Sequence, residues 1–251
     1  MLSKERQNII RSLIKSNGAV TTSNLVKKFD VSLETIRRDL LYMEQSGLLT
    51  RVHGGAVAVG EMKPFYDLEK RNLDNSDKKR ELSLLAAEFI DEDDYICIDS
   101  GSTAIIFAEI LKEKFSELTV ITHSLDVFEI LHNKFTVILC GGYFFEKENS
   151  FFGSPTIDMI NTVHAKKAFI FPSAVSLEFG IYDYQQDLLL VQKAMLKAAD
   201  EIFILADSSK FESKALLKLD DMCADYAYIT DSKLPLELKQ LYLENSIKII
   251  T

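Results

Sequence analysis

Seven apolar runs of strand length recur through the later part of this 251-residue chain, and stretches with helical periodicity separate several of them. The runs are YICID (95–99), LTVIT (118–122), TVILC (136–140), KAFIFPS (167–173), EIFILAD (201–207), YAYIT (226–230) and IKIIT (247–251). Apolar residues have helical spacing at 102–114, 124–132, 186–200 and 235–243. Continuous apolar strands that alternate with helices are typical of a mostly parallel sheet covered on both faces. This part of the chain is therefore predicted to be an α/β domain.

The first part of the chain has a different pattern, which predicts three short helices. Apolar residues from Ile9 to Ile14 have helical spacing, and Ser3 is the expected N-cap of that helix. A second helix is expected after the cluster 21–23 (Thr-Thr-Ser), and a third after Ser32.

A hairpin is expected directly after the third helix. The run LLTRVHGGAVAV (48–59) alternates around Gly54-Gly55, a glycine pair suited to a two-residue turn. Three helices followed by a hairpin predict a winged helix-turn-helix over residues 1–58, and we call the hairpin the wing.

Charge is divided unevenly along the chain, whose formal net charge is −9. Residues 1–60 hold nine of the 29 Lys and Arg and five of the 38 Asp and Glu, which gives them a net charge of +4 and leaves −13 for the rest. A basic segment attached to an acidic domain indicates a small module that binds a polyanion.

The third helix carries two adjacent arginines, Arg37 and Arg38, with Glu34 and Thr35 on the same outer turns. In helix-turn-helix proteins this part of the helix enters the major groove, where Arg binds guanine O6 and N7. The alternative is that the two arginines pair with Glu34 or Glu44 on a solvated face. The spacing, the hairpin and the local basicity together favour contact with DNA.

The segment VSLETIRRDLLYMEQSGLLTRVHGGA (31–56) resembles the N-terminal signature of the DeoR family of bacterial transcriptional regulators. The resemblance implies that Thr35, Arg37 and Arg38 meet operator DNA, that the wing flanks them, and that the protein represses transcription. The predicted DNA-binding residues are Thr22, Ser32, Glu34, Thr35, Arg37, Arg38, Arg51, His53 and Gly54.

Residues 59–76 are charge-rich, contain Pro64 and have only sparse apolar spacing, so we predict a linker there. A helix at about 77–90 is expected to open the second domain, which covers 77–251. The whole chain is thus predicted to be an α+β two-domain protein.

Polar residues follow four of the predicted strands directly. They are Ser100-Gly101-Ser102-Thr103, His123-Ser124, Gly141-Gly142 and Ser208-Ser209-Lys210. Because the carboxyl ends of parallel strands share one edge of the sheet, these loops are expected to form a ligand crevice. Backbone N–H groups at a helix start, together with the Lys210 ammonium, suit an anion.

The motifs IDSGST, LTVITHSL, VILCGG, VQKAML and ILADSSKF are similar, in this order, to the effector domain of DeoR-type regulators. That domain resembles ribose-5-phosphate isomerase in fold and usually senses a phosphorylated sugar, so a small anionic metabolite of this kind is the implied effector. The predicted effector-binding residues are Asp99, Gly101, Ser102, Thr103, His123, Ser124, Gly141, Gly142, Asp207 and Lys210.

The chain departs from the family pattern at several positions near these motifs. Phe145 stands where an arginine is common, His123 where an asparagine is usual, and Lys166, Pro172 and Leu188 where an aspartate, a glycine and a glutamate are common. Losing an arginine and a glutamate from a polar pocket removes partners for a ligand, so we hypothesise an atypical effector or a weakened recognition of sugar phosphates.

The expected function is that of a DNA-binding transcriptional regulator, a repressor of carbohydrate metabolism genes, that acts in the cytoplasm as a homo-oligomer (dimer or tetramer) on paired half-sites. No apolar run approaches the length of a membrane span, and neither a cofactor nor a metal ion is expected. Cys97, Cys140 and Cys223 lack metal-ligand spacing and indicate reduced thiols.

Two alternatives stay open from the residues. The first is a sugar-phosphate isomerase-like enzyme with a DNA-binding appendage, in which Asp99, Asp207 and Lys210 exchange protons. The second is a winged helix used for protein contacts. We favour a regulator without enzymatic activity.

Overall fold

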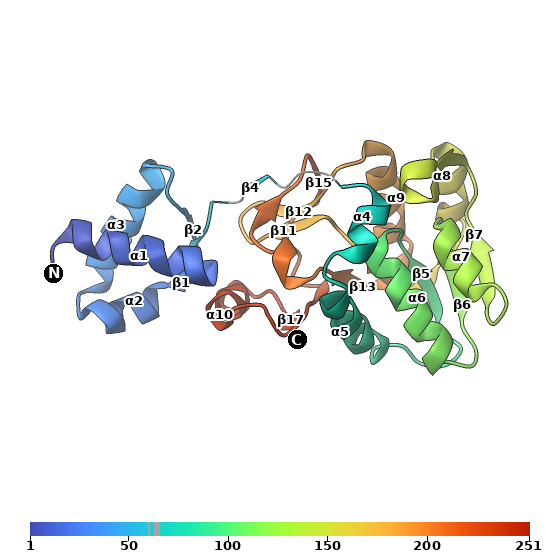
Figure 1. The fold of residues 1–251 in the computed structure, drawn as a ribbon, viewed down its shortest axis with the longest axis horizontal. Helices are drawn as coiled ribbons and strands as arrows, with labels where there is room; N and C mark the ends of the chain where they lie inside the picture. Colours follow the sequence, from blue (N-terminus) through green and yellow to red (C-terminus); the bar gives the residue numbers. More distant parts are fainter. Residues whose placement is uncertain (60, 63–65) are drawn as a thin grey trace.

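The computed structural model describes residues 1–59, 61–62 and 66–251. A helical N-terminal domain lies at one end of the molecule, beside a larger C-terminal domain built on a parallel sheet (Figure 1). The predicted α+β two-domain architecture is confirmed.

The N-terminal domain combines three helices with a small antiparallel sheet of strand order β1-β3-β2. Its elements are α1 (Ser3–Asn17), β1 (Ala19–Thr21), α2 (Thr22–Phe29), α3 (Leu33–Gln45), β2 (Thr50–Val52) and β3 (Gly55–Val57). The three helices and the hairpin match the prediction. Strand β1 was not predicted, because three residues are too few to show an alternating pattern.

The starts of the helices follow the expected chemistry in two cases of three. The hydroxyls of Thr21 and Ser32 accept hydrogen bonds from the backbone N–H groups of Asn24 and Thr35 and so cap α2 and α3. The prediction for Ser3 was wrong, since Leu2 occupies the N-cap position of α1. The Ser3 hydroxyl instead donates a hydrogen bond to Asp39 in α3.

The turn of the wing lies one residue earlier than predicted. Gly54 has a φ of +82°, whereas Gly55 is already the first residue of β3 and pairs with Thr21. A Cβ atom on Gly55 would lie 2.0 Å from the carbonyl oxygen of Val20. The second glycine therefore serves the close approach of β1 and β3 rather than the turn.

All seven predicted strands of the C-terminal domain form one parallel sheet, with the order β17-β16-β13-β10-β5-β6-β7. Their bounds are β5 (Tyr95–Ile98), β6 (Thr119–Thr122), β7 (Thr136–Leu139), β10 (Ala165–Ile170), β13 (Ala199–Leu205), β16 (Ala227–Ile229) and β17 (Ile249–Ile250). The predicted parallel sheet is therefore correct in every strand.

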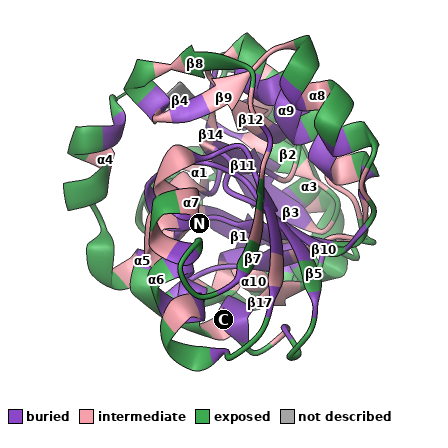
Figure 2. Ribbon diagram, turned by 90° about the vertical axis from the view of Figure 1, so that its right-hand side faces the viewer, coloured by how far each residue is buried: buried purple, intermediate pink, exposed green. Residues whose placement is uncertain are grey.

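Helices cover both faces of this sheet, and its central strands are mostly buried between them (Figure 2). The edge strands β7 and β17 are only partly buried. One layer holds α5 (Ser76–Ala87), α6 (Ser102–Lys114) and α7 (Leu125–Leu131), and the other holds α8 (Ser154–Asn161), α9 (Gln186–Lys197) and α10 (Leu236–Glu244). Alternate strand residues face opposite layers: Ile96 and Ile98 join one apolar cluster and Cys97 joins the other. No helix in the described part of the chain has both the length and the apolar character needed to cross a membrane.

Short elements that the sequence pattern did not predict surround the carboxyl edge of the sheet. They are β4 (Glu61–Met62), α4 (Leu68–Leu73), β8 (Tyr143–Phe145), η1 (Glu146–Glu148), β9 (Ser150–Phe152), β11 (Ala174–Ser176), β12 (Gly180–Asp183), η2 (Ser208–Lys210), β14 (Ser213–Lys214) and β15 (Leu217–Asp220). Helix α4 lies within the predicted linker, while Pro64, on which that prediction drew, lies outside the described residues. The domain limits themselves stay a prediction.

Helix α10 lies between the two domains (Figure 1). Its residues Leu238 and Leu241 belong to the same apolar cluster as Ala19 of β1 and Val57 of β3. At its C-terminal end the Asn245 side chain donates a hydrogen bond to the carbonyl oxygen of His53 in the wing, at 2.9 Å. The wing is thus in direct contact with the C-terminal domain.

Two of the three cysteines are buried, and all three are free thiols. Burial raises the pKa of Cys97 to about 12 and that of Cys140 to about 11. Since the thiolate is the reactive form, these two side chains are inert at neutral pH.

Candidate functional site

The outer face of α3 presents the predicted basic pair to solvent. Arg37 and Arg38 are exposed, as is Glu34, and Thr35 is half-buried. Among the ion pairs of the described residues none involves Arg37 or Arg38, and Glu44 pairs with Arg51 instead. The geometry therefore does not support the alternative in which Arg37 and Arg38 pair with Glu34 or Glu44.

The wing is fixed to α3 by the pairing of Arg51 with Glu44. The Glu44 carboxylate accepts hydrogen bonds from Arg51 Nε at 2.8 Å and from the Arg51 backbone N–H at 2.9 Å. The hydrogen bonds from the Arg51 side chain and backbone hold the pKa of Glu44 below its usual value. The Arg51 side chain stays 40% exposed, so its guanidinium remains accessible to a phosphate beside the helix.

Thr22 and Gly54, both predicted to meet DNA, fix the wing to α2. The carbonyl oxygen of Gly54 accepts hydrogen bonds from the Thr22 backbone N–H at 2.8 Å and from its hydroxyl at 3.0 Å. Ser32 caps α3 and contacts the Thr35 hydroxyl at 2.9 Å. The geometry gives these residues a positioning role, and their contact with DNA stays a prediction.

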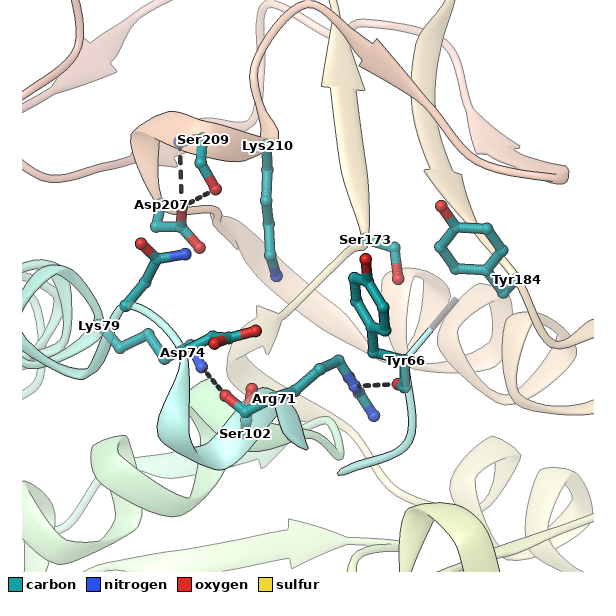
Figure 3. A pocket seen from close by; sticks show the side chains of 11 residues that line it. Tyr66, Arg71, Asp74, Lys79, Ser102, Ser173, Tyr184, Asp207, Ser209 and Lys210 are labelled. Carbon is teal, nitrogen blue, oxygen red and sulfur yellow. Dashed lines mark hydrogen bonds between the residues drawn. The ribbon is translucent and has the colours of Figure 1, made fainter. Parts of the chain in front are cut away.

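A cavity of about 300 Å³ lies at the carboxyl edge of the parallel sheet. Its lining residues come from the segment before α4, from α4, α5 and α6, and from the loops after β10, β12 and β13 (Figure 3). They are Tyr66, Arg71, Asp74, Asn75, Lys79, Ser102, Ser173, Tyr184, Asp207, Ser209 and Lys210.

Three cationic side chains meet in this cavity. Lys79 is buried, and its ammonium donates a hydrogen bond to the carbonyl oxygen of Arg71. The Arg71 guanidinium pairs with the buried Glu148, and Lys210 Nζ donates to Pro172 O at 2.7 Å. Burial, and then the positive charge of Lys210, lower the pKa of Lys79 to about 8. The cavity therefore brings three cationic side chains together, with the carboxylates of Asp74 and Asp207 in the same wall.

Hydroxyl and carboxylate groups line the same cavity beside the cations. Burial alone would raise the pKa of Asp207, but the Lys210 ammonium and two hydrogen bonds from Ser209 outweigh it and lower that pKa. On the opposite side, the Ser173 hydroxyl donates to Asp183 at 2.8 Å. These groups are suited to hold the hydroxyls of a ligand whose anionic end faces the cations.

Of the predicted effector-binding residues, Ser102, Asp207 and Lys210 line the cavity. Gly101 adjoins it, since a Cβ there would lie 3.7 Å from Arg71 Nη1. Ser102 is the first residue of α6, so the N-terminal backbone N–H groups of this 13-residue helix begin at the cavity wall.

Asp99 and His123 lie in a buried network that adjoins the cavity rather than in its wall. His123 Nδ1 is 2.9 Å from Phe151 O and therefore carries a hydrogen, while Nε2 is 3.1 Å from Asp99 Oδ1. The side-chain amide of Gln192 donates to Asp99 and to Asp183, at 2.9 Å in each case. Through Asp183, which bonds Ser173, the network reaches the cavity wall.

The four other predicted residues have structural contacts and do not line this cavity. Ser124 caps α7, and Thr103 is buried in α6. Gly141 O accepts a hydrogen bond from Thr156, and a Cβ on Gly142 would lie 2.5 Å from a carbonyl oxygen of β9. The part of these residues in ligand binding remains a prediction.

The departures from the family pattern fall in two groups. Three of them lie outside the cavity wall: Phe145 packs edge-on against Phe152, Lys166 pairs with Asp94 at the amino edge of the sheet, and Leu188 is buried in α9. By contrast, the Pro172 carbonyl oxygen accepts a hydrogen bond from Lys210, and His123 Nε2 lies within hydrogen-bond distance of Asp99. Only the second group of changes reaches groups in or next to the cavity.

The sequence reasoning missed Arg71 and Lys79, because both precede the first strand of the C-terminal domain, in a segment assigned to the linker and the opening helix. Their spacing of four gave no usable signal, because Arg71 lies in α4, Lys79 lies in α5, and Asn75 between the two helices has a φ of +55°. Tyr66, Ser173 and Tyr184 carried no local pattern either.

A winged helix-turn-helix with an exposed basic helix, joined to a parallel α/β domain with a cation-lined cavity, defines a DNA-binding transcriptional regulator with a sensor domain. Residues 6–61 match the model of the DeoR-like helix-turn-helix domain, and residues 74–232 match that of the DeoR C terminal sensor domain. The chain belongs to the DeoR family and binds operator DNA.

Relatives extend over nearly the whole chain. The uncharacterized HTH-type transcriptional regulator YulB of Bacillus subtilis (strain 168) is 33% identical, over 96% of this chain and 94% of its own. The lactose phosphotransferase system repressor of Lactococcus lactis subsp. lactis is 35% identical over 84% of each chain. The glycerol-3-phosphate regulon repressor of Escherichia coli (strain K12) is 27% identical over 99% of each.

These relatives are named as regulators and repressors, and this chain is likewise a transcriptional regulator rather than the isomerase-like enzyme of the alternative. Among solved structures, ribose 5 phosphate isomerase A from Neisseria gonorrhoeae is similar over 54% of this chain and 53% of its own, with a TM-score of 0.40 and 21% identity.

Proposed function

We propose that this protein is a cytoplasmic repressor of carbohydrate metabolism genes, and that a phosphorylated sugar bound in the cavity controls its affinity for operator DNA. The observation that carries this proposal is the convergence of Arg71, Lys79 and Lys210 on one cavity of about 300 Å³. Two relatives whose names refer to a lactose phosphotransferase system and to glycerol-3-phosphate support the choice of ligand class.

The cavity offers different partners to the two ends of such a ligand. A phosphate dianion near Lys79 and Lys210 also meets the N-terminal N–H groups of α6, which favour an anion. Sugar hydroxyls have Ser173, Tyr184 and Asp207 as partners on the other walls. A cavity of this volume is at the small end of the range for ligand sites, which suits a sugar phosphate rather than a nucleotide cofactor.

The DNA-binding surface calls for more than one copy of the chain. Helix-turn-helix regulators read two half-sites about one helical turn apart, with one recognition helix in each major groove. We therefore propose a homo-oligomer, a dimer or a tetramer, in which the α3 helices of two copies face successive grooves of the operator.

A thermal-shift screen of the full chain tests the ligand class. The panel contains common hexose and pentose phosphates, glycerol 3-phosphate, the same sugars without phosphate, and inorganic phosphate. We expect at least one phosphorylated sugar to raise the Tm by several degrees while its free sugar does not, because ligand binding to the folded state stabilises it. The hypothesis of an atypical effector predicts instead that no common hexose or pentose phosphate stabilises the protein.

Operator binding is tested with a DNA fragment from upstream of the protein's own gene. We expect the apparent affinity to fall steeply as salt rises, because phosphate contacts release counterions. The stabilising sugar phosphate should then change this affinity at constant salt. An affinity that does not change with salt would contradict DNA binding and favour a winged helix that contacts protein.

A further inference from the structure

One short segment of the C-terminal domain, residues 207–214, links the cavity to α10 and to the strand that follows the wing. It begins at the cavity, where Asp207, Ser209 and Lys210 form part of the wall. It ends in β14, which pairs in parallel with β4, the strand between the wing and α4. The segment is therefore in contact both with the ligand site and with the chain that leads to the DNA-binding domain.

The middle of this segment is attached to α10 by two contacts with one residue. The ring of Phe211 packs edge-on against the ring of Tyr242, with centroids 5.5 Å apart. The next residue, Glu212, accepts a hydrogen bond from the Tyr242 hydroxyl at 2.6 Å. Tyr242 is fully buried, so its side chain cannot move out into solvent when the segment is displaced, and α10 must move with it.

Glu212 is held in an unusual backbone conformation. Its φ of +48° lies in the left-handed region, which a residue with a Cβ rarely adopts. Hydrogen bonds to its buried carboxylate from the Leu177 backbone N–H at 3.0 Å, the Ser176 hydroxyl at 3.3 Å and Tyr242 fix it there. A residue held against its preference by several contacts is suited to change conformation when one of them changes.

The far side of α10 contacts the wing directly. Asn245 donates a hydrogen bond to His53 O, and the Glu244 carboxylate lies close enough to the tip that a Cβ on Gly54 would be 2.3 Å from it. Leu238 and Leu241 pack in one apolar cluster with Ala19 of β1, the strand on which β3 of the wing pairs. The orientation of the wing therefore depends on the position of α10.

We propose that the segment 207–214 and α10 transmit the state of the cavity to the wing, and that the contact of Glu212 with Tyr242 is the coupling point. This inference rests on the proposed function for its biological meaning. An anion in the cavity competes with Pro172 O for the Lys210 ammonium and shifts η2. The shift passes through Phe211 and Glu212 to Tyr242 in α10, and the end of α10 displaces the wing together with α3, to which Glu44 holds it.

The test is a double-mutant cycle read by amide hydrogen exchange of the full chain, without any ligand. Lys210→Met changes the cavity end, and Tyr242→Phe removes the coupling hydroxyl. We expect Lys210→Met to change the exchange rates of wing amides, residues 50–57, by about fivefold or more, because local opening responds to the contacts that oppose it. In the Tyr242→Phe background the same substitution should leave these rates within about twofold.

Tyr226→Phe is the matched control, since it removes another tyrosine hydroxyl from a carboxylate, that of Asp220 at 2.8 Å, outside this path. It should leave the response of the wing to Lys210→Met intact. If Tyr242→Phe does not fold, Asn245→Ala, which cuts the contact of α10 with the wing at a half-buried position, takes its place and should also diminish the response.

Two results would overturn the proposal: no response of the wing to Lys210→Met, or an equal response with and without the Tyr242 hydroxyl. A separate measurement, the binding of inorganic phosphate at matched ionic strength, tests whether the cavity binds an anion. Failure of phosphate and of every sugar phosphate to bind would count against the proposed function, and the ligand-free cycle would still decide the coupling.

Discussion

The guanidinium of Arg6 in α1 forms a buried ion pair with the carboxylate of Asp39 in α3, and the exposed residues Arg37 and Arg38 directly precede that aspartate. The Asp39 carboxylate also accepts hydrogen bonds from Ser3 and Gln7. The acid that follows the basic pair in the sequence therefore faces inward. It fixes the rotation of α3, so that the two arginines before it face outward.

Replacing Asp39 by Asn should destabilise the N-terminal domain by about 3 kcal/mol, because the Arg6 charge is left buried and unpaired. Urea unfolding followed by helical circular dichroism measures the loss, and Glu34→Gln on the exposed face of the same helix serves as the control. Equal stability of the two variants would show that the ion pair contributes nothing.

The same aspartate predicts a pH dependence. Burial alone would raise its pKa, but the hydrogen bonds from Arg6, Ser3 and Gln7 outweigh burial and lower the pKa below 3.8. Because the folded-state pKa is the lower one, the stabilisation is complete above the unfolded value and is lost as pH falls through the folded value. Acid unfolding of wild type should therefore be steeper below about pH 4 than that of Asp39→Asn.

Arg38 and Arg51 should differ in how they bind DNA. Arg38→Ala should cost about 1–3 kcal/mol and relax the preference at one base pair, as expected for a bidentate contact to a base. Arg51, paired with Glu44 beside the helix, should contact phosphate, so Arg51→Ala should weaken all sequences alike and reduce the salt slope by about one. Affinities for the operator and for single-base variants, at several salt concentrations, separate the two effects. Identical profiles would contradict this division of roles.

The fold was predictable from sequence to the extent that its elements show periodicity. Seven apolar runs and the capping residues Thr21 and Ser32 were enough to identify the sheet and two helix starts. Short elements such as β1 and α4 escaped, because three to six residues do not define a period. Ser3 was misassigned because a tertiary contact with Asp39 outweighed its local capping preference.

The cavity was harder to predict than the sheet that carries it. Residues that directly follow strands, such as Asp207 and Lys210, could be placed because the carboxyl edge of a parallel sheet brings them together. Arg71 and Lys79 reach the cavity from α4 and α5, which precede the sheet in the chain. Only tertiary packing brings these helices to that edge, and no local pattern encodes it.

Gly55 should be intolerant of a side chain for a steric reason. A Cβ there would lie 2.0 Å from Val20 O, so Gly55→Ala must separate β1 from β3, at a cost of about 1–3 kcal/mol. Thermal unfolding measures this loss. Gly141→Ala is the matched control, because its Cβ would meet nothing within 4 Å. If the two variants have the same Tm, the close approach of β1 and β3 does not limit the stability of the protein.

Lys79 should take up a proton when an anion binds in the cavity. Its pKa is lowered from 10.5 to about 8, by burial first and then by Lys210, so near pH 8 a fraction of the unliganded protein has a neutral Lys79. Since the folded-state value is the lower one, the unfolded state binds more protons between about pH 8 and 10.5, and the contribution of this group to stability rises with pH there.

A bound dianion reverses the shift in the pKa of Lys79, because it favours the charged ammonium. The affinity for a sugar phosphate should therefore fall as pH rises above about 8, and titration calorimetry in two buffers of different ionisation heat should detect proton uptake. Lys79→Met should abolish the uptake and weaken binding about tenfold or more, whereas Lys193→Met, at an exposed position of α9, should change neither. Binding at pH 8 without any proton uptake by wild type would place the anion away from Lys79.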